Sequence, residues 1–175
     1  MFIYLYTYLI FSKIGFVTFN NEVKGIGDGT QQEVKINGNN LNDAEFIRNF
    51  GQKSVDIIKK PIKDTFDSLL KHLYSIEENG QTALGPAVLF AVNLLNSAAL
   101  GSKIILCTDG IANIGISAIE GVHQPEDLDK LDAFYKEVGK QAKEKVILTY
   151  FNFRESLYLL LLLKGKNQRF QFFLT

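Results

Sequence analysis

The sequence has little cysteine and little histidine, and this scarcity excludes two kinds of site. Cys107 is the one cysteine and there are two histidines. A single cysteine cannot form an internal disulfide, and it favours a reducing, intracellular location, which we expect to be the cytoplasm. One thiol and two imidazoles are too few for a zinc cage of thiolates and imidazoles. A metal ion here would be a hard cation held by oxygen atoms.

An excess of charge of either sign is also missing. Lys plus Arg and Asp plus Glu number 19 each, so the formal net charge is zero, and no basic run stands out. Nucleic acids and anionic membranes are attracted by positive patches on a protein surface. We therefore expect no nucleic-acid partner.

Long hydrophobic runs are missing as well. Residues 1–11 and 157–163 are apolar, but a membrane-spanning helix needs about 20 such residues. We therefore expect no membrane span. The chain of 175 residues is long enough for one domain, which we place at 13–151, between an atypical apolar segment at 1–12 and an atypical tail at 152–175.

The domain begins with extended segments and continues with helices. Residues 13–19 and 22–27 are joined by Asn20 and Asn21, which tolerate hairpin turns, so we expect a β-hairpin followed by a third strand at 31–36. Apolar residues at helical spacing then predict four helices. These helices are expected at 42–50, where Gly51 stops the first, from Pro61 through Leu73, from near Pro86, and at 126–145.

Two apolar runs complete the order of elements. Residues 103–108 (KIILCT) are typical of a parallel strand covered on both faces, and 146–151 form one more strand. Strands that alternate with helices indicate a three-layer α/β/α sandwich of Rossmann type, with a mostly parallel sheet and an antiparallel edge hairpin. Ligands gather at the carboxyl ends of the strands in such sheets, and Asp109 follows one of them.

Two loops carry the residues best suited to chemistry. Gly80–Pro86 (GQTALGP) places the hydroxyl of Thr82 just before a helix, and residues 107–110 (CTDG) place the carboxylate of Asp109 just after a strand. Oxygen atoms from several loops suit Mg²⁺ or Ca²⁺. The alternative interpretation is structural, because Thr82 could cap the helix and Asp109 could cap its turn.

Three segments together resemble a known family. Residues 13–23 (KIGFVTFNNEV), 80–88 (GQTALGPAV) and 103–115 (KIILCTDGIANIG) are similar in kind and order to a von Willebrand factor A domain, most of all to that of circularly permuted Ras-like proteins. The resemblance implies a partial domain that lacks its first β-α unit. It also implies a protein-binding module, not an enzyme, and a GTPase domain elsewhere in the parent protein.

The resemblance further implies a metal-ion-dependent adhesion site. The family builds this site from an Asp-x-Ser-x-Ser loop, a threonine and an aspartate, and the last two correspond to Thr82 and Asp109. The loop has no counterpart, because no aspartate precedes Asp28. We therefore expect a degenerate site in which Mg²⁺ binds weakly or not at all, although an intact parent could bind Mg²⁺ together with an acidic side chain of a partner protein.

Two other functions stay open at the level of the sequence. A metal-dependent phosphohydrolase could use Asp109 as an aspartyl nucleophile. That chemistry needs a second acidic group and a phosphate-holding lysine or serine close by, whereas Lys103 lies at the far end of its strand. A structural scaffold that needs no metal is the third interpretation.

Overall fold

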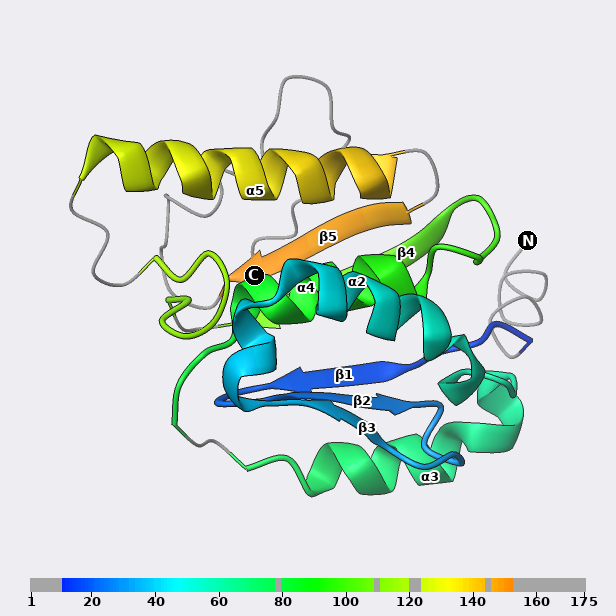
Figure 1. Ribbon diagram of the computed structural model, residues 1–175. Coiled ribbons are helices and arrows are strands. Elements are labelled where there is room, and N and C mark those ends of the chain that lie inside the picture. The colour runs from blue at the N-terminus through cyan, green and yellow to red at the C-terminus, as the bar shows by residue number, and fades with distance from the viewer. Residues whose placement is uncertain (1–10, 78–79, 109–110, 120–123, 144–145, 153–175) are drawn as a thin grey trace.

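The computed structural model of the chain describes residues 11–77, 80–108, 111–119, 124–143 and 146–152. Within these ranges the strands form two separate sheets (Figure 1). The first is antiparallel and contains, in this order, β1 (Phe16–Phe19), β2 (Val23–Gly27) and β3 (Val34–Ile36). The second is a parallel pair of β4 (Ser102–Thr108) and β5 (Val146–Asn152).

Helices cover both sheets (Figure 1). Two helices, α2 and α4, lie on one side of the three-stranded sheet, α3 lies on its other side, and α5 runs along the parallel pair. The helices are α2 (Ala44–Lys53), α3 (Ile62–Tyr74), α4 (Leu84–Leu94) and α5 (Pro125–Lys143), with short 3-10 helices η1 (Gly38–Asn42) and η2 (Val55–Ile57).

The expected sandwich with a mostly parallel sheet is wrong for the part of the chain that the structure describes. Three of its five strands pair antiparallel, as only the edge hairpin was expected to do. Their connections at 20–22 and 28–33 are too short for the crossover of a dozen or more residues that parallel pairing requires. Among the strands that pair with each other, only β4 and β5 have such a connection, and it contains α5.

The expectation that β4 is covered on both faces is also wrong. Leu106 and Thr108 are buried, but the alternate residues Lys103, Ile105 and Cys107 are exposed, Ile105 to 63%. Side chains alternate between the two faces of a strand, so a single covered face buries every second residue. The apolar run in the sequence could not show that one of these faces would be open.

Helix α2 extends further than the sequence predicts. It begins where the side chain of Asp43 accepts a hydrogen bond from the backbone N–H of Phe46 (2.9 Å), and it runs through Gly51 to Lys53. Gly51 is not a helix stop. A Cβ atom at this position would lie 2.9 Å from the carbonyl oxygen of Phe90, so the missing side chain lets α2 approach α4 closely.

The core is centred on α4. Every residue of this helix except Ala91 is buried, as expected for a helix apolar on most sides. By contrast, the apolar face expected on α3 is only partly covered. Leu69 is buried, whereas Phe66 and Leu73 are 57% and 48% exposed.

A buried carboxylate connects the three-stranded sheet to the segment before α3. The side chain of Asp28 is fully buried just after β2. One carboxylate oxygen accepts hydrogen bonds from the backbone N–H (2.9 Å) and the hydroxyl (2.8 Å) of Thr30. The other accepts from the backbone N–H groups of Lys59 and Lys60, both at 2.8 Å. Four donors therefore satisfy this carboxylate.

These contacts set the direction of the pKa shift of Asp28. Burial by itself raises the pKa of the carboxyl group, but the hydrogen bonds from Lys60, Thr30 and Lys59 outweigh it and lower the pKa below the usual 3.8. The folded state therefore favours the ionised form. The resulting stabilisation is fully present above the unfolded-state pKa and is lost as the pH falls through the lower folded-state pKa.

Asp28→Asn should destabilise the protein at pH 7. The amide replaces one acceptor oxygen with a donor that faces other donors, so we expect a loss of about 2 kcal/mol in the free energy of unfolding. Urea unfolding followed by circular dichroism measures this loss. The difference from the wild type should shrink as the pH is lowered below 3.8.

The exposed residue Asp67 provides the control for this prediction, because Asp67→Asn removes the same charge from the surface of α3. We expect that variant to unfold like the wild type. Equal stability of the Asp28 and Asp67 variants at pH 7 would contradict the role assigned to the buried carboxylate.

Candidate functional site

Thr82 lies where two loops meet. It is half-buried in the loop that precedes α4. Its backbone N–H donates to the side-chain oxygen of Asn113 (2.7 Å), and the backbone N–H of Asn113 donates to the carbonyl oxygen of Thr82 (3.2 Å). The loop that follows β4 is therefore held against the Thr82 loop by two reciprocal hydrogen bonds.

A third loop joins this cluster. The backbone N–H of Ala83 donates to the carbonyl oxygen of Asn20 (2.8 Å), which lies in the turn between β1 and β2. The loop after β4 is fixed at a second point, where the N–H of Ile116 donates to the carbonyl oxygen of Leu41 (2.8 Å). We call the loop residues Asn20, Thr82, Ala83 and Asn113 the loop cluster.

The start of α4 is closed to ligands. Ala83 and Leu84 are 0% exposed, and Gly85 and Pro86 are buried with them. A Cβ atom at position 85 would collide with the carbonyl oxygen of Ile116, so Gly85 is required for this close approach. Anions that bind at helix N-termini need accessible backbone N–H groups. This helix start cannot bind a phosphate.

The structure excludes the interpretation of Thr82 as the cap of α4. The residue at the cap position of α4 is Ala83, and no side-chain hydrogen bond caps the helix. Thr82 is therefore not the helix cap. Its hydroxyl lies in a loop whose backbone is already bonded to Asn113.

Asp109, the second predicted ligand, lies outside the described residues together with Gly110. The last described residue before it, Thr108, is buried at the end of β4. The pairing of Thr82 with Asp109 stays a prediction. Among the residues that the structure does describe, no group of three or more His, Cys, Asp or Glu side chains is arranged to hold a metal ion.

Asn113 has a hydrogen-bond partner in the loop cluster that the sequence pattern did not reveal. It is a polar residue in a short apolar segment, residues 111–116 (IANIGI). A polar residue in such a segment indicates a side chain with a specific hydrogen-bond partner. The partner, Thr82, is 31 residues earlier in the chain, and no local pattern identifies it.

Part of the chain is similar to a known protein. No protein-family model matches the chain. The chain is 31% identical over 134 residues to a protein of Dictyostelium discoideum named "Circularly permutated Ras protein 1". The matched region covers 75% of this chain and 15% of the relative. This chain is therefore related to a Ras-like protein over a small part of that protein's length.

This relation corrects the functional expectations from the sequence. The absence of a family match gives no support to a von Willebrand factor A domain, and the antiparallel sheet does not fit that fold. The relative is named for Ras, which is a GTPase. The expected non-enzymatic binding module with an adhesion site is therefore wrong. The phosphohydrolase and scaffold alternatives find no support either.

No helix among the described residues is long and apolar enough to cross a membrane. A protein partner that offers an acidic side chain stays a prediction, since neither the fold nor the name of the relative identifies one.

Asn113→Ala should loosen the loop cluster. It removes the acceptor of the Thr82 N–H and leaves a partly buried donor without a partner, so we expect a loss of about 1–2 kcal/mol in the free energy of unfolding. Asn113→Asp keeps an acceptor oxygen and should remain close to the wild type. Chemical denaturation of the three proteins measures the effect, and equal losses in both variants would show that this hydrogen bond is unimportant.

Proposed function

We propose that this chain is part of a circularly permuted Ras-like protein with a GTPase-like function, and that the protein is an enzyme. The observation that supports the proposal is the 31% identity over 134 residues to a relative named for Ras. Ras-type proteins hydrolyse GTP, mainly by positioning the phosphates, Mg²⁺ and a water molecule. Because the chain spans only 15% of the relative, the activity is proposed for the whole protein.

The loop before α4 has a limited role in this proposal. Gly80 and Gly85 have the spacing of the two glycines in the phosphate-binding motif G-x-x-x-x-G-K-[S/T], but Pro86 and Ala87 occupy the positions of its lysine and hydroxyl residue. The buried start of α4 also leaves no accessible N–H groups for a phosphate. We therefore assign the phosphate contacts to residues outside the described ones, and a supporting role to the loop cluster.

Mg²⁺ is the cofactor that this function implies. Mg²⁺ commonly binds through one or two carboxylates together with substrate phosphates, and it keeps several waters. The Thr82 hydroxyl and an Asp109 carboxylate would supply only two oxygen ligands. We therefore propose that Mg²⁺ enters the protein with the nucleotide and that this chain alone holds it weakly.

The proposed location is the cytoplasm. Cys107 is an exposed thiol. Exposed thiols stay reduced in the cytosol, whereas secreted proteins generally pair their cysteines. Fractionation of cells that express the tagged protein tests this location.

The full-length protein should release phosphate from GTP. We expect a slow intrinsic rate, on the order of 10⁻⁴ to 10⁻² per second as in Ras-type proteins without an activator, and no comparable release from ATP. Thr82→Ala should change the rate by less than about twofold, because its loop does not contact phosphate in this proposal. The proposed function would be wrong if phosphate were released from GTP no faster than in buffer alone, or equally fast from GTP and ATP.

This chain should bind Mg²⁺ more weakly than about 1 mM, because two oxygen ligands and water give low affinity. Isothermal titration at pH 7 measures the affinity. Thr82→Ala and Asp109→Ala each remove one of these two ligands and should weaken the signal further. A micromolar dissociation constant that either variant abolishes would place a real cation site in this chain.

A further inference from the structure

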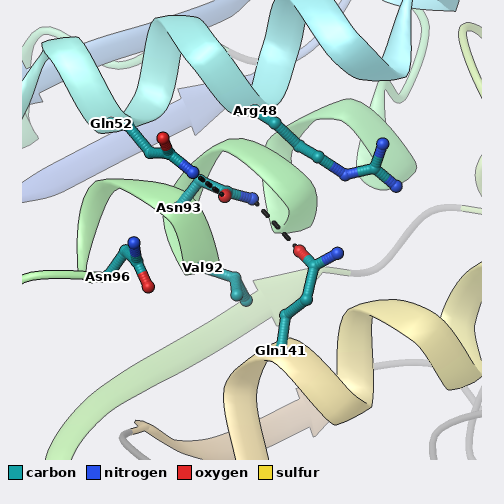
Figure 2. A pocket seen from close by; sticks show the side chains of 6 residues that line it. All are labelled: Arg48, Gln52, Val92, Asn93, Asn96 and Gln141. Carbon is teal, nitrogen blue, oxygen red and sulfur yellow. Dashed lines mark hydrogen bonds between the residues drawn. The ribbon is translucent and has the colours of Figure 1, made fainter.

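A polar cavity lies between three helices, away from the loop cluster. It has a volume of about 210 Å³, which is below the roughly 300 Å³ of pockets that hold drug-sized ligands. In Figure 2, Arg48 and Gln52 extend from α2, Gln141 rises from α5, and α4 passes between them. The lining residues are Arg48, Gln52, Val92, Asn93, Asn96 and Gln141.

A chain of amide hydrogen bonds fixes the middle of this cavity. Gln52 donates to the side-chain oxygen of Asn93 (3.2 Å), and the Asn93 amide nitrogen donates to the side-chain oxygen of Gln141 (3.4 Å) and to the carbonyl oxygen of Leu89 (2.9 Å). Both N–H groups of the Asn93 amide are thus used. Gln52 has one N–H left after its bond to Asn93, and Gln141 has one left after its bond to Glu137, so each can donate to a ligand.

Arg48 adds a positive charge at one end of the cavity (Figure 2). Its Nε atom is shielded from solvent and has no hydrogen-bond partner. Leaving a buried donor of a charged group without an acceptor costs free energy, and such a group needs an explanation. None of the ion pairs found between described residues includes Arg48.

No carboxylate lines the cavity to balance this charge. Outside the lining, Glu137 accepts a hydrogen bond from the Gln141 amide nitrogen (3.2 Å). Glu137 is also 4.0 Å from the ammonium group of Lys140, so part of its own charge is already balanced. The lining of the cavity therefore combines one guanidinium with four amide side chains and contains no carboxylate.

We propose that this cavity binds a small oxyanion, either inorganic phosphate or the carboxylate of a small organic acid. The guanidinium of Arg48 presents a rigid fork of donors that matches the oxygens of both groups. Gln141 lines the cavity from α5, and its second N–H can add a neutral donor. The volume of the cavity suits small anions, and the partly exposed Arg48 side chain can contact them through its terminal N–H groups.

Thermal unfolding of the full chain in sodium phosphate, sodium succinate and sodium chloride at equal ionic strength tests this proposal. An anion that binds only the folded state raises the melting temperature beyond the effect of the chloride salt. A rise in phosphate alone assigns the ligand to phosphates, and a rise in succinate alone assigns it to carboxylates. No rise in either salt, up to 20 mM as an order-of-magnitude limit for a useful site, overturns the proposal.

Arg48→Gln removes the charge and should weaken binding at least about tenfold, as measured by isothermal titration with the anion that raises the melting temperature. Lys53→Gln is the matched control, because Lys53 is an exposed cation on the same helix that does not line the cavity. If both variants weakened anion binding equally, the binding would be a general attraction of anions to positive charge, and the proposed site would be wrong.

Gln141→Glu provides a second test of anion binding if the Arg48 variant does not fold. It places a carboxylate of nearly the same shape in the cavity, where it competes with the free anion for Arg48. We expect the protein to stay folded and to lose the response to phosphate and succinate. An unchanged response would show that the anion binds elsewhere.

Discussion

The complete burial of α4 is the constraint on which the rest of the structure depends. This helix is apolar around nearly its whole circumference, so it is stable only when other elements cover every side. α2 covers one side through the close approach at Gly51, and α5 and β1 contact others. Burying a helix in this way removes a large apolar area from water, and the loss of any of these neighbours would return part of that area to solvent.

The burial of α4 also places the loop cluster and the polar cavity at opposite ends of this helix. At its start, the covering loops bring Asn20 and Asn113 to the residues beside Thr82 and close the backbone N–H groups of the helix to outside ligands. Toward its end, the apolar sequence gives way to Asn93, and the cavity with Arg48 begins. Main-chain contacts therefore cover the start of α4, whereas the polar cavity lies between helices near its end.

Much of the secondary structure followed from local patterns, whereas the arrangement depended on contacts that no local pattern shows. The hairpin was predictable because Asn20 and Asn21 suit a tight turn, and the burial of α4 followed from its composition. The extent of α2 was not predictable, because a glycine that ends a helix and one that allows close packing look alike in sequence. Only the carbonyl oxygen of Phe90, which lies opposite Gly51, identifies this glycine as a packing residue. The parallel sheet was overestimated because apolar strands have the same pattern in both kinds of pairing.

Asn93 shows how a single residue could have indicated more of the site. It is the only polar side chain in α4, and it lies in an otherwise apolar helix that is buried on nearly all sides. A buried amide must find partners, so its position predicts polar groups on the neighbouring helices, as Gln52 and Gln141 prove to be. Arg48 lies one turn before Gln52 on α2, at the spacing that places two side chains on one face of a helix. The polar cavity is therefore a consequence of one asparagine that the apolar core had to accommodate.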